Sequence, residues 1–257
     1  MKKINSEVII LFSLLSLLFI SLFLPIVNSA ESSITASVIV LQREPGLLLY
    51  DSFEGTNLAK LSNKIQYVTG YYGQGVYLSR TNSYLAYSSD YLDLQQGAVE
   101  FWINRKYINN DKLEHTFFYN FHDANNAFKL YKGANNNLIF IMYTPKCSPP
   151  KCWQYIYLAN ADLVLPRSQW RKIIVNWSSQ LLSLQVCKAD GTCLKNEKLN
   201  PSLPVKKGTY FVLGRGLSGY SAESIIDELK IYGRAVSSSS LLGNIINFLT
   251  YQEPQNF

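Results

Sequence analysis

The sequence predicts an all-β protein built as a two-sheet antiparallel sandwich, with a hydrophobic leader helix at the N-terminus and a short helix at the C-terminus. Runs rich in aromatic and β-branched residues recur about every ten to fifteen residues from Gly46 onward. Clusters of turn residues separate them, such as "YYGQG" and "GANNN". The chain shows no internal repeat and no strand–helix alternation, which argues against a nucleotide-binding fold.

The N-terminus has the pattern of a secretory signal. Two lysines precede an apolar run from Val8 to Leu24, and small residues follow in "IVNSA". A basic start, an apolar stretch and small residues at a cut site are typical of a signal peptide. We therefore interpret residues 1–30 as a signal peptide, with cleavage after Ser29 or Ala30.

The same apolar run is nearly long enough to span a bilayer, which takes about 20 residues. A retained membrane anchor, with a tether through residues 8–27, is therefore an alternative, and a pilin-type filament stem is a third. The expected location is secreted or on the extracellular face of the cell membrane. Residues 31–44 are polar and are interpreted as a linker.

Composition agrees with an extracellular protein and excludes one class of partner. Charged residues make up 16% of the 257 residues, below the roughly 25% of average domains, while Tyr occurs 18 times. The net charge is +6, but the basic residues are scattered rather than clustered. Without a basic cluster to follow a phosphate backbone, nucleic-acid binding is not expected.

Twelve apolar runs are expected to form strands, because their length and residue types fit strands and turn residues bound them. "YYGQG" precedes the second run, "GANNN" separates the sixth from the seventh, "ADG" follows the tenth, and "KKG" precedes the eleventh. In order, the runs are 47–53, 76–79, 83–88, 98–107, 115–123, 127–133, 137–144, 152–159, 170–177, 181–187, 209–214 and 224–232.

A convincing helical period occurs only near the C-terminus, at residues 237–251. A run of serines that can cap a helix precedes apolar residues at helical spacing. These are Leu241, Leu242, Ile245, Ile246 and Leu249.

Four cysteines behind a secretory leader predict two disulfides. Cys187 and Cys193 flank "KADGT", where a three-residue turn with Gly191 at positive φ would place them opposite each other in a hairpin. Cys147 and Cys152 flank "SPPK" and would close a loop. A four-cysteine zinc site is the alternative, although the spacings are wider than in common zinc knuckles.

Seven stretches carry a family resemblance. They are "GLLLYDSFEG", "GYYGQGVYLS", "GAVEFWINRKY", "QWRKIIVNW", "LQVCKADGTC", "YFVLGRG" and "IIDELKIYGRAVS". Their order and spacing resemble laminin G-like, concanavalin A-like lectin-glucanase jelly-roll domains. The resemblance implies that the sandwich is a jelly roll, placed at residues 45–251 with a tail at 252–257. Both cysteine pairs, the long "CSPPKC" insertion and the extended C-terminal segment depart from the family pattern.

The resemblance also implies a structural Ca²⁺ site. Related jelly rolls often tie the closing-strand Asp to the first loop through Ca²⁺, which takes oxygen ligands. Asp227 occupies the position of that Asp, and Glu54 or a nearby carbonyl of "DSFEG" would be its partner. In the alternative, Asp227 accepts N–H bonds from that loop without an ion.

No catalytic residue is predicted. Glucanases of this fold carry paired carboxylates on one strand face, because hydrolysis needs two carboxyls flanking the glycosidic bond. In "ESIIDE", Glu223 and Asp227 would share a face and Glu228 would point away, which does not match that motif. His115 and His122 would lie on opposite faces of one strand, so they would not form a metal pair; His122–Asp123 is interpreted as an ordinary loop.

Exposed aromatic residues are the best candidates for ligand contacts, because an aromatic face complements the apolar face of a sugar. We favour Trp153, Tyr155 and Tyr157, which follow the "CSPPKC" loop, although alternating strand aromatics are more often core. Five further candidates are Tyr71, Tyr72, Tyr84, Tyr87 and Tyr91. The glycosylation sequon at Asn176 lies in an expected strand, which makes its use doubtful.

The sequence thus indicates a secreted or surface-tethered, non-catalytic module that binds a glycan or a cell-surface partner. One alternative is a secreted carbohydrate-active hydrolase or lyase with divergent catalytic residues. Another is a structural coat or adhesin subunit.

Overall fold

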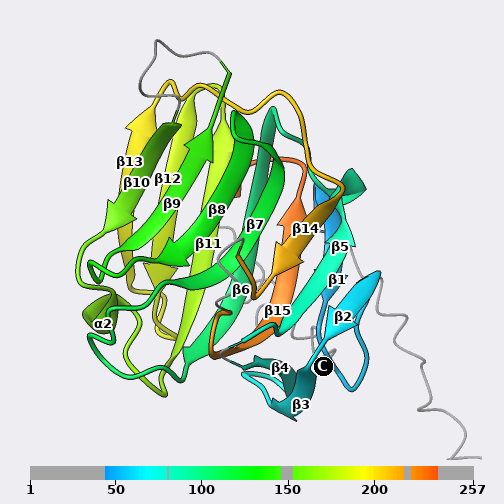
Figure 1. The fold of residues 1–257 in the computed structure, drawn as a ribbon, viewed down its shortest axis with the longest axis vertical. Helices are drawn as coiled ribbons and strands as arrows, with labels where there is room; N and C mark the ends of the chain where they lie inside the picture. Colours follow the sequence, from blue (N-terminus) through cyan, green and yellow to red (C-terminus); the bar gives the residue numbers. More distant parts are fainter. Residues whose placement is uncertain (1–43, 80, 146–152, 217–220, 237–257) are drawn as a thin grey trace, which may run out of the picture. The chain divides into compact units, whose positions relative to one another are not determined.

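The computed structural model describes residues 44–79, 81–145, 153–216 and 221–236. Within these ranges the chain forms two antiparallel sheets that face each other (Figure 1). This confirms the predicted all-β jelly-roll sandwich. The predicted leader, the C-terminal helix at 237–251 and the tail lie outside the described residues. Within those residues, no helix has the length and apolar character needed to cross a membrane.

The first sheet has eight strands in the order β13-β12-β11-β6-β15-β4-β3, and β1 also pairs with β15. Its strands are β1 (Leu47–Asp51), β3 (Ile65–Thr69), β4 (Gln74–Leu78), β6 (Gln96–Arg105), β11 (Trp170–Ser178), β12 (Leu181–Cys187), β13 (Cys193–Leu199) and β15 (Ser224–Tyr232).

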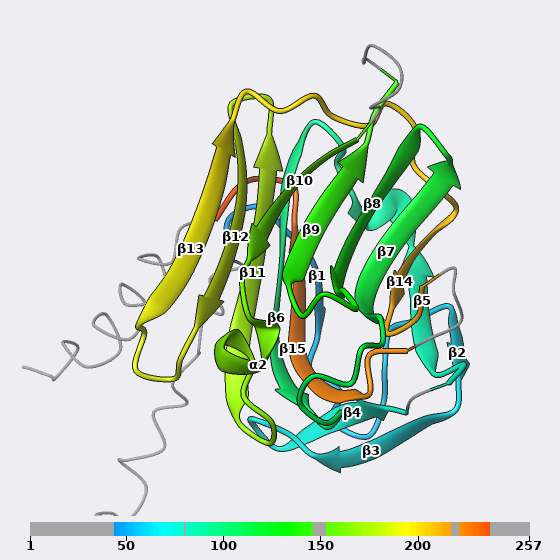
Figure 2. The same ribbon diagram turned by 60° about the vertical axis from the view of Figure 1, so that its left-hand side comes forward.

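The second sheet has seven strands in the order β10-β9-β8-β7-β14-β5-β2. Its strands are β2 (Leu61–Asn63), β5 (Tyr84–Ser88), β7 (His115–Asp123), β8 (Asn126–Lys132), β9 (Leu138–Tyr143), β10 (Trp153–Leu158) and β14 (Tyr210–Leu213). Two short helices, η1 (Ser89–Tyr91) and α2 (Ala161–Val164), lie in connections. The edge strands β10 and β13 lie on the same side of the sandwich (Figure 2), where the Asn196 side chain donates to the Tyr157 carbonyl at 2.7 Å.

Every predicted run overlaps an observed strand, although β4 and β6 begin two residues before their runs, and the sequence prediction missed β2, β3 and β13. β13 reads "CLKNEKL" and most of its residues are exposed. Charged residues are common on exposed edge strands because they discourage pairing with another chain. The missed strand therefore lacks the apolar pattern that marks a half-buried strand.

Aromatic side chains fill the space between the sheets. The ring centre of Phe118 on β7 lies 5.2 Å from that of Phe211 and 6.1 Å from that of Phe128. It lies 6.3 Å from Phe101, which belongs to the opposite sheet. These four residues are at most 1% exposed. Burying each ring stabilises the fold by about 1.5–3 kcal/mol, so this cluster holds the two sheets together.

A β-bulge in β15 explains why its apolar residues do not alternate. The register with β6 shifts between Asp227 and Lys230, and Glu228 in this interval has φ 54°. The extra residue changes the phase of the strand, so that Ile226 and Leu229 are both fully buried.

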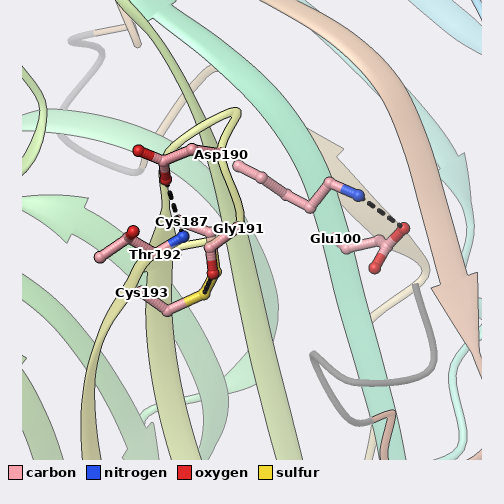
Figure 3. The surroundings of a disulfide bond; sticks show 7 residues. Glu100, Cys187, Asp190, Gly191, Thr192 and Cys193 are labelled. Carbon is pink, nitrogen blue, oxygen red and sulfur yellow. Dashed lines mark hydrogen bonds and ion pairs between the residues drawn. A yellow bond between two sulfur atoms is a disulfide. The ribbon is translucent and has the colours of Figure 1, made fainter. Parts of the chain in front are cut away.

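One predicted disulfide lies within the described residues. Cys187 ends β12 and Cys193 begins β13, the two are directly opposite, and their sulfurs are bonded (Figure 3). Gly191 has φ 84°, as the turn requires, and the Asp190 carboxylate accepts the Thr192 N–H at 2.8 Å. This confirms the Cys187–Cys193 pairing and leaves these two sulfurs unable to bind zinc. Cys147 and Cys152 lie outside the described residues.

Candidate functional site

Three exposed aromatic side chains line the edge strand β10. Trp153, Tyr155 and Tyr157 are 41%, 43% and 41% exposed, whereas the intervening Ile156 is 4% exposed and faces the core. This alternation follows from the two-residue period of a strand. The ring centres of Trp153 and Tyr155 are 5.3 Å apart, and those of Tyr155 and Tyr157 are 6.0 Å apart. We call these three residues the β10 ladder.

Strand register places further side chains beside the ladder. Trp153 is opposite Tyr143 on β9, Tyr143 is opposite Ala127 on β8, and Ala127 is opposite Phe121 on β7. Residues directly opposite in a sheet present their side chains on the same face. These four residues form the first row, which crosses the outer face of the seven-stranded sheet at about 4.8 Å per strand.

A second row runs parallel to the first. It contains Tyr155, Ile141, Lys129 and Tyr119, each opposite the next on neighbouring strands. Two rows of mostly aromatic and aliphatic side chains therefore extend from the β10 ladder across four strands.

A pocket of about 280 Å³ lies at the far end of these rows. Its lining includes Tyr119, Phe121, Ala127, Lys129 and Tyr143 from the two rows, and Asp123 from the end of β7. Ala127 carries the smallest side chain of the first row and stands between Phe121 and Tyr143. The small side chain between two rings explains the hollow at this position.

The polar groups around the pocket are held by neighbours. The Asp123 carboxylate accepts from the Asn126 side chain at 3.0 Å and from the Asn125 N–H at 2.8 Å, and these bonds lower the pKa of Asp123. Lys129 Nζ lies 2.8 Å from Glu114 Oε1. Burial raises the pKa of the Tyr143 phenol, so it stays neutral and can donate a hydrogen bond at neutral pH.

The two acids predicted to hold Ca²⁺ both contact the turn between β3 and β4. Asp227 Oδ2 accepts the N–H groups of Tyr71 and Tyr72 at 2.8 and 2.9 Å, and Asp227 Oδ1 accepts the Glu228 N–H at 2.8 Å. Glu54 accepts the Gln74 N–H at 3.1 Å. The expected contact of Asp227 with the "DSFEG" loop is thus corrected: its hydrogen-bond donors belong to the "GYYGQ" turn and to its own neighbour Glu228.

Glycine permits this close approach of the carboxylates. A Cβ atom at Gly70 would lie 2.6 Å from Asp227 Oδ2, and one at Gly73 would overlap Glu54 Oε1. Neither approach leaves room for a Cβ atom, so any other residue at either position would displace a carboxylate.

The described residues fit hydrogen bonding better than Ca²⁺ binding at Asp227. Ca²⁺ takes six to eight oxygen ligands, whereas the groups around this carboxylate are N–H donors that point at its oxygens. Within the described ranges, no three His, Cys, Asp or Glu side chains gather in a set that could hold a metal ion.

Other acids and both histidines have separate partners. The Glu228 carboxylate accepts a hydrogen bond from the Tyr50 hydroxyl at 2.9 Å, so it does not share a partner with the Asp227 carboxylate. His115 is 1% exposed and lies 2.5 Å from Asp111, whereas His122 is 42% exposed and lies 3.6 Å from Asp123.

The remaining tyrosines proposed for sugar stacking differ in their surroundings. Tyr87 is fully buried and donates to Asp51 at 2.9 Å, so it belongs to the core. Tyr91 packs against the core, and the Tyr71 ring stacks on Trp102 with centres 3.6 Å apart. Tyr72 is 60% exposed, and Arg215 lies over the ring of Tyr84.

Sequence reasoning identified the β10 ladder but missed the pocket. A two-residue period in β7 would have placed Tyr119 and Phe121 on the outer face. The register of β7 shifts between Thr116 and Phe118 and again between Phe121 and Asp123. These irregularities interrupt the alternation on either side of Tyr119 and Phe121, so the outward signal in β7 is limited to this short stretch.

Solved structures show the same fold in other proteins. Domain 4 of AbnA, a GH43 extracellular arabinanase from Geobacillus stearothermophilus solved in complex with arabinotriose, has a TM-score of 0.60 and 18% identity, over 78% of this chain and 98% of that domain. The binding domain of Paraclostridial Mosquitocidal Protein 1 has a TM-score of 0.57 and 16% identity, over 80% of this chain and 53% of that one. The Botulinum neurotoxin serotype G binding domain has a TM-score of 0.57 and 12% identity, over 82% and 53%.

This chain therefore spans about half the length of the toxin binding domains, and at these identities the likeness shows the fold alone. No curated protein matches the sequence. The pattern of the concanavalin A-like lectin/glucanases superfamily matches residues 79–241. That match covers more than half of the chain, and the chain belongs to this superfamily.

Proposed function

We propose that this protein is a non-catalytic module that binds a glycan on the outer face of its seven-stranded sheet. The observation that carries the proposal is the β10 ladder, a run of three exposed rings, two of which, Trp153 and Tyr155, begin the rows that lead to the pocket. Pockets that bind small ligands combine apolar walls with a few placed polar groups, which is the composition of this face.

Aromatic rings and neutral hydroxyls suit a sugar. A sugar ring has an apolar face that packs on aromatic carbon, and hydroxyls that exchange hydrogen bonds with tyrosine and carboxylate oxygens. Tyr143 and Asp123 supply such groups at the pocket.

The acids of the closing strand support binding rather than hydrolysis. A glycosidase needs two carboxyls that flank one glycosidic bond. Asp227 is fully buried and engaged by three N–H groups, and Glu228 accepts the Tyr50 hydroxyl. Neither carboxylate lies on the face that carries the β10 ladder, since both belong to the other sheet.

The predicted leader and the Cys187–Cys193 disulfide support a place outside the cell, where disulfides persist. The likeness in fold to an extracellular arabinanase domain and to toxin binding domains supports a glycan or another cell-surface molecule as the partner.

A glycan array tests the proposal, with protein purified after expression of the full-length chain. We expect binding that falls about tenfold or more in Trp153→Ala and in Tyr155→Ala, because each loses an exposed ring. Tyr72→Ala is the matched control, since it removes an exposed ring elsewhere. Glu223→Ala should also have a smaller effect than either ladder variant. Equal losses in the control and the ladder variants would contradict this placement of the site.

A further inference from the structure

We propose that the ligand is a separate, neutral oligosaccharide chain that lies along β10 and contacts at least three sugars, rather than the flat face of a crystalline polysaccharide. This inference rests on the proposed function and narrows it to one ligand class. Three observations on the described residues support it: the tilt of the ladder rings, the direction of the ladder and the nearby charges.

The ladder rings cannot form a flat platform. Adjacent ring planes are inclined by 34° between Trp153 and Tyr155, and by 34° between Tyr155 and Tyr157. With centres 5.3 and 6.0 Å apart at this tilt, neighbouring rings stand at an angle to each other rather than in one plane. A crystal face would need coplanar rings side by side, whereas a free chain can follow a stepped surface.

The longest run of neighbouring exposed rings follows β10. All three ladder rings are at least 41% exposed, whereas the first row crosses the part-buried Tyr143 and the 7% exposed Ala127 before it reaches Phe121. Beside Tyr155 in the second row, Ile141 is 8% exposed and so adds little contact surface. The three ladder residues are spaced by two residues, or about 7 Å of strand. The long axis of the exposed surface therefore follows β10, which favours a single chain laid along the strand.

The base in the rows and the acid at the pocket both disfavour an acidic ligand. Lys129 in the second row lies 2.8 Å from Glu114, and Asp123 lines the pocket. The Asp123 carboxylate would repel an acidic sugar at the pocket. Among the described residues of the two rows, Lys129 is the one cationic group and it is neutralised, which favours an uncharged ligand over an acidic one.

Titration with matched sugars tests the inference. The probes are soluble cello-oligosaccharides and arabino-oligosaccharides of one to five units, microcrystalline cellulose as the flat form of a neutral polymer, and oligogalacturonates as acidic chains. We expect affinity for at least one soluble neutral series to rise about tenfold per unit up to three units. Crystalline cellulose and oligogalacturonates should bind more weakly than that series.

Truncation of one end of the ladder gives the sharper readout. Tyr157→Ala should lower affinity for the trisaccharide about tenfold while changing affinity for the disaccharide by less than about twofold, since two rings remain. Leu199→Ala, which trims an exposed side chain on β13, is the matched control and should leave both affinities unchanged. Equal melting temperatures would show that all variants are folded.

The outcomes separate the inference from the proposed function. Binding to crystalline cellulose without soluble chains, equal affinity for one and three units, or preference for oligogalacturonates would overturn the inference and leave glycan binding intact. Absence of binding to any glycan, on the array as well as in titration, would overturn both.

Discussion

Asp227 is a buried carboxylate whose ionisation should affect stability. Burial raises the pKa of Asp227 from 3.8 to about 6, although the N–H groups of Tyr72, Glu228 and Tyr71 oppose this shift. Because the folded-state pKa is above the unfolded one, the folded protein binds the proton more tightly between about pH 4 and pH 6. This group therefore adds stability as pH falls through that window, and the added stability is lost as pH rises through about 6.

Urea unfolding across pH values measures this contribution. The unfolding free energy of wild-type protein, relative to that of Asp227→Asn, should increase as pH falls from about 6.5 to 4.5. Other carboxylates also contribute. Burial raises the pKa of Asp51 and of Glu100, whereas at Asp111 hydrogen bonds from Lys132 and His115 overcome burial and lower the pKa. The comparison is therefore between the two profiles, and superimposable profiles would contradict the role assigned to Asp227.

Chelation distinguishes the two roles considered for Asp227. Since N–H donors occupy its oxygens, we expect EDTA to leave the melting temperature unchanged. A ligand that binds only the folded state raises the melting temperature, so bound Ca²⁺ would reveal itself by a decrease on chelation. A decrease in wild-type protein that disappears in Asp227→Ala would establish the calcium site instead.

Asn176 should carry no glycan despite its sequon. The residue is 2% exposed, its amide donates to Ser183 at 3.1 Å, and its oxygen accepts the Val236 N–H at 2.7 Å. A glycan on this side chain could not fit the folded sheet. Mass spectrometry of protein secreted from yeast should show an unmodified peptide here, and a glycosylated, folded protein would contradict the buried placement.

Among the elements, the β12–β13 hairpin depends on its disulfide. Cys187 and Cys193 are six residues apart, and closing so short a loop stabilises a fold by about 2 kcal/mol on the chain-entropy model. The double variant Cys187→Ser/Cys193→Ser should lose about that much in urea unfolding. Glycan affinity should be unchanged, because the hairpin meets β10 through Asn196, which bonds the Tyr157 carbonyl, and not through the disulfide. A loss of binding with an unchanged melting temperature would show that the hairpin contributes to the ligand site.

How well each element could be predicted depends on how strongly its residues are patterned. The runs 98–107 and 170–177 become the central strands β6 and β11, whose apolar residues are nearly continuous because the core covers them. β13 could not be recognised from the sequence, because an exposed edge strand does not need the apolar residues that mark a buried one. The disulfide hairpin was predictable because its turn and its two cysteines lie within seven residues of sequence.

The candidate site could be predicted only where it lies on one strand. Trp153, Tyr155 and Tyr157 are visible as an alternating triplet, because they follow one another on β10. The pocket joins β7, β8 and β9, and its residues meet only through the register of three strands. Register depends on which residues pair across the sheet, and bulges in β7 change that pairing by one residue. A single sequence does not contain that information in readable form.

At the scale of the whole molecule, the candidate binding residues and the closing-strand acids lie on different sheets. The seven-stranded sheet presents the β10 ladder and the pocket, while the eight-stranded sheet holds the closing-strand acids and the disulfide. The core between them, centred on Phe118, keeps both outer faces rigid. A preformed face loses less conformational freedom on binding, which favours affinity without any need for reactive groups.

This division predicts that the protein does not turn over polysaccharides. Hydrolysis needs a proton donor with a raised pKa and a second carboxylate at a set separation, and removing either lowers the rate by orders of magnitude. At the pocket, hydrogen bonds lower the pKa of Asp123, so it is poorly suited to donate a proton at neutral pH.

Reducing-end assays with arabinan, xylan, β-glucan and pectin should therefore show no release above a heat-denatured control. Single carboxylate variants such as Asp123→Ala and Glu223→Ala should keep most of their affinity. Release of reducing ends that either substitution abolishes would instead establish the hydrolase.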